Sequence, residues 1–373
     1  MQRGDQGAAG ATAELATLRG RAATDLEEAR FAGYVSGARV LVTGAGGSLG
    51  RELCRRLAGL GAGAIALVDQ AEAALVDIYD ELRFELGFAG ARPVLADLRS
   101  PARARGVVEE HRPQIVFHTA AYKLVPVVEA HPVEAVANNV LATRVLVEAA
   151  AGAGAGRFVL YSTDKAIRPA NVLGRTKALA ECIVGTAARQ PSATRFACIR
   201  LGNALESSGS MLPLFRRQLA AARPVTVTDS RMTRYVMTIG ETASLALVAG
   251  ALADRGDVFR LDMGRPVRVV DAARAAIRAS GDGRGAAVEI IGSRPGEKLH
   301  EDLEAPGEPV WRTEHEQVVR CGPRYADADW LGARLERLRE LVADADADGA
   351  RAELERIVPG IRVDSGTEAT VGV

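Results

Sequence analysis

The sequence predicts an α/β fold in which helices wind over both faces of a parallel sheet, and three observations favour it. Short apolar runs alternate with amphipathic helical patterns through the first half of the chain. The apolar run 39–42 breaks into closely spaced glycines at Gly44, Gly47 and Gly50, and a helical pattern follows directly. Asp69 closes the second apolar run, about 20 residues after the last of these glycines. This order of elements is typical of a Rossmann-type doubly wound sheet with right-handed crossovers.

The elements can be assigned in chain order from these patterns. The helix after the glycines carries Leu49, Leu53 and Leu57 at near-helical spacing, so one face of it is expected to pack on the sheet. The predicted strands are 39–42, 64–69, 93–96, 114–118, 157–162 and 194–200. The predicted helices are 48–60, 71–86, 101–111, 126–151 and 171–189.

Ligands of such sheets bind at the carboxyl ends of the strands, so the residues just after each strand are expected to form the site. The glycines would allow a tight turn and a close approach of the backbone to a pyrophosphate, which the helix N-terminus would face. Asp69 would accept hydrogen bonds from a ribose and repel a 2′-phosphate, which favours NAD over NADP, although Arg51 and Arg55 leave NADP open. The alternative is a turn aspartate beside a glycine-rich loop that binds nothing. The expected cofactor-binding residues are Gly44, Gly47, Ser48, Leu49, Gly50, Asp69, Asp97, Leu98 and Ala120.

After residue 200 the alternation fades, and a smaller mixed α/β part is expected to cap the cofactor crevice. A helix at 238–252 and a strand at 258–262 within that part are expected to return to the first domain. One further helix is predicted at 15–31. The expected division is a partly disordered leader at 1–36, an NAD-binding Rossmann domain at 37–200, a substrate-binding region at 201–320 and a helical C-terminal extension and tail at 321–373.

Composition limits the classes of partner and compartment. The chain has 373 residues, of which 48% are hydrophobic and 25% charged, as is ordinary for a globular protein. Lys plus Arg equals Asp plus Glu, 47 each, so no net charge favours nucleic acid or an acidic membrane surface. The four cysteines form no C-x-x-C pair, and no apolar run is long enough to span a bilayer. We therefore expect a cytoplasmic protein with reduced thiols, no membrane insertion and no nucleic-acid partner.

The residues expected to carry chemistry leave the fifth strand together. Thr163, Asp164 and Lys165 follow it directly, and Leu173 and Lys177 lie four apart on the next helix, hence on one face. A carboxylate beside an amine offers an acid and a base that titrate as a unit. The alternative is an ordinary surface Asp-Lys pair in a loop. His118 at another strand end is expected to be a packed residue, and no cluster has the spacing of metal ligands, so no metal is expected.

Seven motifs carry a resemblance to a known family. They are TGAGGSLG at 43–50, HTAAYKLVPVVE at 118–129, NNV at 138–140, STDKAIRPANVLGRTK at 162–177, LGNALESSGSMLPLF at 201–215, TRYVMT at 233–238 and RPGEKL at 294–299. On these motifs the chain resembles the extended short-chain dehydrogenase/reductases. Within them it is similar to the CapD-like polysaccharide-biosynthesis dehydratases that act on UDP-N-acetylglucosamine. The resemblance covers roughly residues 37–320 and corresponds to the soluble catalytic region, without the membrane helices of many relatives.

The resemblance implies an NAD-dependent nucleotide-sugar 4,6-dehydratase. It implies oxidation at carbon 4, elimination of water across carbons 5 and 6, and hydride return to carbon 6, which gives a UDP-4-keto-6-deoxy sugar. Lys165 would be the base, Asp164 the acid, and Lys177 would hold the nicotinamide ribose. The usual tyrosine of the superfamily is replaced by Leu173, so the first proton would leave through Thr163 and water, or to the Asp-Lys pair. The expected catalytic residues are Thr163, Asp164, Lys165 and Lys177, with Tyr122 as the nearest substitute base.

The resemblance also implies where the substrate binds. Asn203, Arg234 and Arg294 would lie on the nucleotide side of a UDP-sugar, and Lys123 would line the sugar pocket. The leucine favours retention of configuration at carbon 5, and a homo-oligomer paired through helices around 130–150 and 171–189 is expected. Two alternatives stay open: a sugar-nucleotide epimerase, and a non-catalytic NAD-binding sensor or scaffold.

Overall fold

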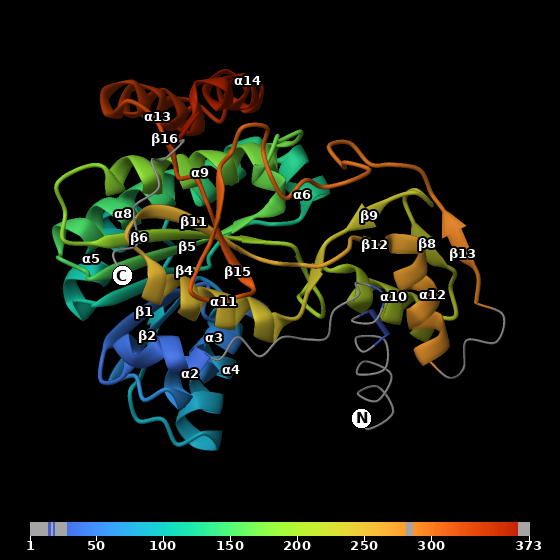
Figure 1. Ribbon diagram of the computed structural model, residues 1–373, viewed down its shortest axis with the longest axis horizontal. Coiled ribbons are helices and arrows are strands. Elements are labelled where there is room, and N and C mark those ends of the chain that lie inside the picture. The colour runs from blue at the N-terminus through green and yellow to red at the C-terminus, as the bar shows by residue number, and fades with distance from the viewer. Residues whose placement is uncertain (1–13, 16–17, 19–27, 281–285, 365–373) are drawn as a thin grey trace.

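The structure is a computed structural model that describes residues 14–15, 18, 28–280 and 286–364. One nine-stranded sheet runs through it, parallel from its β3 edge to β11 and antiparallel at β15 and β14 (Figure 1). The predicted fold class is confirmed, whereas the two antiparallel edge strands were not predicted. In spatial order the strands are β14 (Val310–Arg312), β15 (Val318–Cys321), β11 (Arg255–Leu261), β6 (Arg195–Leu201), β5 (Arg157–Thr163), β4 (Ile115–His118), β1 (Arg39–Thr43), β2 (Ala64–Asp69) and β3 (Ala91–Leu95).

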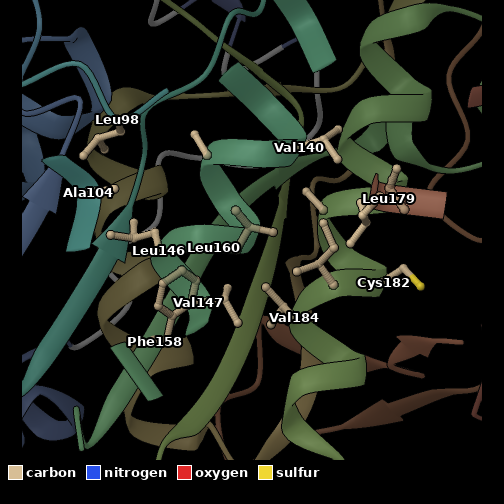
Figure 2. Packing of buried hydrophobic residues seen from close by; sticks show 14 of the residues in the cluster. Leu98, Ala104, Val140, Leu146, Val147, Phe158, Leu160, Leu179, Cys182 and Val184 are labelled. Carbon is tan, nitrogen blue, oxygen red and sulfur yellow. The ribbon is translucent and has the colours of Figure 1, made fainter. Parts of the chain in front are cut away.

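Helices cover both faces of the sheet because side chains alternate along each strand. Leu41 of β1 joins one apolar core, while its neighbours Val40 and Val42 join the other. Figure 2 shows the first core, where Phe158 and Leu160 of β5 pack with residues of the covering helices. That first face carries α5 (Pro101–His111), α8 (Ala142–Gly152) and α9 (Val172–Ala188). The second face carries α3 (Ser48–Gly59), α4 (Glu72–Asp80) with a π-helical extension (Glu81–Glu85), and α11 (Ile239–Leu252).

The single helix predicted at 126–151 is wrong, because the chain breaks it twice. His131 leaves the helical region with φ −131° and ψ 64°, since the ring of Pro132 disfavours a helical backbone in the residue before it. A π-helical stretch then shifts the register of the side chains. The segments are α6 (Val125–Ala130), α7 (Pro132–Val136), the π-helix (Ala137–Leu141) and α8.

A smaller lobe lies beside the carboxyl ends of the strands (Figure 1). Its own core contains Leu212 and Phe215 from one helix and Ala272 and Ala276 from another. Helix α11 and strand β11 depart from this lobe and belong to the main sheet and its cover. The lobe comprises α10 (Met211–Ala220), α12 (Val269–Ala279), β8 (Val225–Val227), β9 (Thr233–Arg234), β12 (Val267–Arg268) and β13 (Val288–Ile290), and a short pair of β7 (Asn203–Ala204) with β10 (Val236–Met237) leads into it.

The C-terminal elements pack back on α7 and α9 (Figure 1). Their leucines, among them Leu335 and Leu354, belong to the same core as β5 and α9. Helix α9 is therefore buried along nearly its whole length within one chain. This covers part of the surface through which pairing of two copies was expected. The elements are β16 (Arg324–Tyr325), α13 (Ala328–Ala343), α14 (Ala347–Ile357), a 3-10 turn (Val358–Gly360) and β17 (Arg362–Val363).

Little of the predicted leader can be compared with the structure. Most of the helix expected at 15–31 and most of the leader at 1–36 lie outside the described residues. The part next to the sheet forms α2 (Glu28–Phe31) and a 3-10 turn (Ala32–Val35), and the Tyr34 hydroxyl donates to the carbonyl of Leu247 in α11 at 3.0 Å. Within the described ranges, no helix combines the length and the apolar character needed to cross a membrane.

Candidate active site

The candidate site is a crevice along the carboxyl ends of the parallel strands. Two adjoining cavities form it, and they share Leu49, Thr119, Ala121, Tyr122 and Lys123 in their walls. The first cavity lies over β1, β2 and β4, and the second lies over β5 and β6 and faces the smaller lobe. The crevice therefore joins the predicted cofactor residues to the predicted catalytic residues.

Glycine shapes the first cavity. Gly44 has φ +67°, and a Cβ there would stand 2.9 Å from the Cα of Ala120. A Cβ on Gly50 would overlap the carbonyl oxygen of Gly44, so helix α3 approaches the end of β1 only without one. The helix begins at Ser48, and its N-terminal N–H groups open onto the cavity, as an anion such as a pyrophosphate requires. Of the predicted cofactor residues, this cavity is lined by Gly44, Gly47, Ser48, Leu49, Gly50, Asp69, Leu98 and Ala120.

Asp69 is held at the rim of the first cavity. Its carboxylate accepts hydrogen bonds from the backbone N–H groups of Gly46 and Ala71, both at 3.0 Å. In the sequence, Arg51 and Arg55 left the binding of a 2′-phosphate possible. In the structure both pair instead with Glu81 in the π-helical extension of α4. The hydrogen bond from Arg55 lowers the pKa of Glu81. These pairs leave a carboxylate, and no unpaired arginine of α3, at the rim of the first cavity.

Asp97 does not line the crevice, although the sequence suggested it. Arg99 turns back on it with a bidentate contact, Nη2 to Oδ2 at 2.7 Å and Nε to Oδ1 at 3.1 Å. The same hydrogen bonds lower the pKa of Asp97. The aspartate thus ends the loop after β3, and its neighbour Leu98 is the one that reaches the cavity.

The end of β5 carries the predicted acid and base into the second cavity. The Thr163 hydroxyl donates to Asp164 Oδ1 at 2.9 Å, and Lys165 Nζ donates to the same oxygen at 2.9 Å. Asp164 is fully buried, and its other oxygen has no hydrogen-bond partner among the described residues. Thr163 and Lys165 line the cavity, so the buried carboxylate communicates with it through these two side chains.

Lys165 has two further partners, and sequence reasoning missed one. Its Nζ donates to Asn203 Oδ1 at 3.1 Å and lies 3.5 Å from Oε1 of Glu301. Burial alone would lower the pKa of Lys165, but the carboxylates of Asp164 and Glu301 outweigh it and raise the pKa above its usual value. The lysine is therefore an ammonium at rest. We refer to Asp164, Lys165 and Glu301 as the crevice cluster.

Leu173 and Lys177 lie on the first turns of α9 and face the same cavity, as their spacing predicted. Burial lowers the pKa of Lys177 to about 8. No hydrogen bond to its Nζ is found within the described part of the chain, so its donors are available to a ligand. Leu173 offers no exchangeable proton. Helix α9 is fixed here by Asn171, which accepts from the N–H of Gly174 at 2.7 Å.

The four predicted substrate residues all line the second cavity but differ in what they can donate. Arg234 donates three hydrogen bonds to the carbonyls of Thr233, Lys298 and Leu299, and so mainly secures the loop around 298. Arg294 is exposed, and its guanidinium has no partner among the described residues. The remaining two are Asn203, bonded to Lys165, and Lys123, which donates to Ser207 Oγ at 3.1 Å and whose pKa burial lowers.

Asn139 is a positioning residue that the sequence interpretation left unassigned within NNV. Its side chain accepts from the N–H of Tyr122 at 2.9 Å and donates to the carbonyl of Tyr122 at 3.0 Å. This double contact fixes the loop that carries Ala120, Tyr122 and Lys123 along the crevice. The π-helical stretch that aims Asn139 inward could not be anticipated from spacing alone.

His118 is a packed residue, as expected. Its Nδ1 lies 2.7 Å from Thr43 Oγ1, and its Nε2 lies 2.9 Å from Thr143 Oγ1. The Thr143 hydroxyl donates to the carbonyl of Asn139, so it accepts from Nε2–H, and Nδ1 accepts from Thr43. Burial lowers the pKa of His118 to about 3, and the imidazole is neutral. Among the described residues no group of three or more His, Cys, Asp or Glu side chains has the arrangement of a metal site.

A second set of charged side chains lies beneath residues 162–171, the segment that ends β5 and leads into α9. Arg200 makes a bidentate contact with Glu181 at 2.9 and 3.0 Å and bonds Glu308 at 2.8 Å. Arg324 lies 3.3 Å from Glu181 and donates to the carbonyl of Ala166 at 2.7 Å. All four charged groups are more than nine-tenths buried. We refer to Glu181, Arg200, Glu308 and Arg324 as the core cluster.

Comparisons with known proteins agree with this geometry. The model of a family described as polysaccharide biosynthesis protein matches residues 40–323. The capsular polysaccharide biosynthesis protein CapD of Staphylococcus aureus is 43% identical over 295 residues, which are 78% of this chain and 49% of that protein. This chain thus spans about half the length of that relative.

Solved structures show the same fold. The X-ray structure of Pen from Bacillus thuringiensis matches with a TM-score of 0.72 and 28% identity, over 77% of this chain and 88% of that one. The UDP-glucose 4-epimerase of Thermus thermophilus, solved as a complex with NAD, matches with a TM-score of 0.61 and 23% identity, over 71% and 90% of the two chains.

Proposed function

The chain belongs to the polysaccharide biosynthesis protein family, and from this premise we propose that it is an NAD-dependent nucleotide-sugar 4,6-dehydratase acting on UDP-N-acetylglucosamine. The product would be a UDP-4-keto-6-deoxy sugar. The observation that carries the proposal is the hydrogen-bonded pair of Asp164 and Lys165 at the end of β5, beside Leu173 where the superfamily has its tyrosine. An enzyme that only oxidises and reduces has no use for this pair, whereas elimination of water needs both a base and an acid.

The first cavity supports NAD as the cofactor. Its glycines leave room for a pyrophosphate at the N-terminus of α3, and Asp69 offers a carboxylate to a ribose. Lys177, whose donors are unused, would hold the nicotinamide ribose. When bound, NAD supplies the hydride acceptor for carbon 4 and the hydride donor for carbon 6.

Oxidation at carbon 4 also releases the hydroxyl proton of that carbon. Thr163 already donates to Asp164 Oδ1 at 2.9 Å, so it can accept the substrate's proton while passing its own to the aspartate. No residue then needs to replace the tyrosine that is missing at Leu173, because the proton moves through Thr163 and not through a side chain of α9. Asp164 leaves this step as a carboxylic acid.

The new ketone acidifies the hydrogen on carbon 5, and elimination can follow. Lys165, as the neutral amine, takes this hydrogen as a proton. Asp164 gives its proton to the departing hydroxyl of carbon 6, which leaves as water. Asp164 thus gives up here the proton that it gained through Thr163 during the oxidation at carbon 4. Lys165 finally returns a proton to carbon 5 when the hydride reaches carbon 6, so the atoms of the substrate balance over the cycle.

The substrate's diphosphate needs donors near the second cavity. Arg294 is the free guanidinium there, and its planar fork suits two phosphate oxygens at once. Lys123 and Asn203 line the same wall and can contact the sugar. Arg234 serves the site by holding the loop of residues 298 and 299.

Incubation of the purified protein with UDP-N-acetylglucosamine and NAD in deuterated water, followed by mass spectrometry and proton NMR, tests the proposal. We expect loss of one water with deuterium at carbon 5, and the ring couplings would report retention or inversion there. An isomer of unchanged mass would instead favour a sugar-nucleotide epimerase, the activity named for the Thermus thermophilus neighbour. Bound NAD without turnover of any sugar nucleotide would favour a sensor or scaffold.

A further inference from the structure

Glu301 faces Lys165 from the side opposite to Asp164. Its Oε1 lies 3.5 Å from Lys165 Nζ, while Asp164 Oδ1 lies 2.9 Å from the same nitrogen. The Glu301 side chain is only 2% exposed, yet it lines the second cavity. Its Oε2 is buried without a hydrogen-bond partner in the described part of the chain, and the nearest cation to it, Lys298 Nζ, is 4.0 Å away. A buried carboxylate with a spare oxygen is costly unless it takes up a proton or a partner.

The segment that presents Glu301 is anchored to the catalytic loop. Asn171 donates to the carbonyl of Gly296 at 2.8 Å, and Lys298 donates to the carbonyl of Ile167 at 2.9 Å. Gly296 has φ +77°, and a Cβ there would stand 2.9 Å from Asn171, so the turn depends on glycine. Glu301 is therefore held against Lys165 by hydrogen bonds of neighbouring residues that do not involve its own carboxylate.

The proposed reaction leaves one proton unaccounted for at Lys165. The lysine is an ammonium at rest, but it must be a neutral amine when carbon 5 gives up its hydrogen. Asp164 cannot take the surplus proton, since by then it carries the proton from the carbon-4 hydroxyl. A third group beside Lys165 can hold it, and among the described residues Glu301 is the remaining carboxylate within 4.0 Å of Lys165 Nζ.

We propose that Glu301 is the proton store of this site: it takes a proton from Lys165 before the elimination and gives it back after the hydride return. The inference rests on the proposed dehydratase function. Glu301 acts through Lys165.

The cycle then closes without net uptake or release of a proton, and carbon 5 gains deuterium in deuterated water because the N–H protons of Lys165 exchange with solvent between turnovers. At rest the crevice cluster holds one proton, on Lys165. After oxidation at carbon 4 it holds two, on Asp164 and Lys165, and transfer from Lys165 to Glu301 leaves three neutral groups. Elimination moves the carbon-5 proton onto Lys165 and the Asp164 proton onto the leaving water. Lys165 then protonates carbon 5 and recovers its own proton from Glu301, which restores the resting state.

Burial favours this transfer at the right moment. Before oxidation the cluster carries two carboxylates and one ammonium, and the ammonium is needed to balance them. Once Asp164 is neutral, a buried ammonium beside a buried carboxylate can become an uncharged pair, which removes the cost of keeping two ions out of water. The other charged groups facing the cluster are Arg234, which disfavours the charge on Lys165, and Lys298 beside Glu301.

The test uses Glu301→Gln, which keeps the shape and an oxygen toward Lys165 but cannot hold the proton. Single-turnover reactions follow reduced nicotinamide by absorbance and water loss with carbon-5 deuteration by mass spectrometry. We expect the first oxidation to persist, and water loss at pH 7 to fall about 10²-fold. Raising the pH should restore water loss in the variant, because solvent then removes the proton from Lys165, whereas the wild-type rate should not rise from neutral pH to about pH 10.

Glu304→Gln is the matched control, since Glu304 lies on the same segment but is half exposed and paired with Arg260. It should behave like the wild type. If Glu301→Gln fails to fold, Glu301→Asp decides: a slower enzyme with the wild-type pH profile supports the store, and a rate that rises with pH overturns it. A Glu301→Gln enzyme with the wild-type rate, or one slowed equally at every pH, also overturns it. Absence of water loss in the wild type itself overturns the proposed function, and the store with it.

Discussion

The crevice cluster and the core cluster meet at opposite sides of one short stretch of chain. Ser162 donates to Glu181 of the core cluster at 2.6 Å, and the carbonyl of Ala166 accepts from Arg324, while Asp164 and Lys165 between them belong to the crevice cluster. The core cluster matches two arginines with two carboxylates, whereas the crevice cluster sets one lysine between two carboxylates. Arginine keeps its charge at any relevant pH, and lysine can lose it. One set of charges holds the loop, and on the proposed function the other exchanges protons.

Exchanging lysine for arginine in the crevice cluster should have the largest effect on turnover. Lys165→Arg keeps the charge but removes the base, so we expect turnover of the sugar nucleotide to fall by about 10²- to 10⁴-fold. The free energy of unfolding should change by less than about 1 kcal/mol, because the carboxylates keep a cation. Lys165→Ala should also abolish turnover while NAD stays bound. Turnover by mass spectrometry, NAD binding by fluorescence and thermal unfolding measure the three quantities; unchanged turnover in either variant would remove Lys165 as the base.

The reverse exchange in the core cluster should act on stability. Arg200→Lys replaces a fork that reaches Glu181 and Glu308 together with a single ammonium. We expect the free energy of unfolding to fall by about 2–4 kcal/mol, measured by denaturant titration. The rate per folded molecule should change far less than in Lys165→Arg. A stable variant with lost turnover would mean that the core cluster takes part in the chemistry.

Low pH should reduce the stability that the core cluster provides, because Glu181 becomes protonated. Burial alone would raise the pKa of Glu181, but Arg200 and Arg324 outweigh it and hold the pKa below its usual 4.5. The contribution of this group to stability is therefore complete above about pH 4.5 and is lost as the pH falls through the lower, folded-state pKa. Unfolding followed by circular dichroism from about pH 6 to pH 3 should show this loss. Glu181→Gln should be less stable at neutral pH and flatter in acid; an unaltered slope would contradict the assignment.

The smallest effect is expected from restoring the superfamily's tyrosine. Leu173→Tyr adds a proton acceptor on α9, outside both clusters. If the loop route through Thr163 suffices, the first oxidation should change by less than about tenfold, and water loss should persist. Stopped-flow absorbance of reduced nicotinamide measures the first step. A much faster oxidation would show that the crevice cluster alone handles the first proton poorly, and loss of NAD binding would mean that the face of α9 has been misassigned.

Features formed by residues close together in the sequence could be predicted, whereas features formed by residues far apart in the sequence could not. The glycine turn, Asp69 and the run Thr163 to Lys165 each lie within a short stretch of sequence, so their spacing predicted that they line the crevice. Asp97 was expected at the cofactor site, but its carboxylate is paired with Arg99, two residues on, and side-chain pairing leaves no periodic signal. The break at Pro132 was readable, since proline restricts the residue before it.

Longer-range features left no such trace. Glu301 follows the RPGEKL motif and looks like one of many surface acids until the turn at Gly296 brings its segment against Lys165. Asn139 sat in a recognised motif, but only the π-helical stretch decides which way it points. Likewise, the helical C-terminal extension was expected without the prediction that its helix α14 packs on α9.

The bond between Arg324 and the carbonyl of Ala166 sets an order of assembly during synthesis. A ribosome that has translated only the Rossmann half has already made the glycine turn, Asp164 and Lys165. It has not yet made Glu301, Glu308 or Arg324, which hold and complete the loop from the far end of the chain. On the proposed function, the reactive pair would therefore stay idle until the ribosome has passed Arg324.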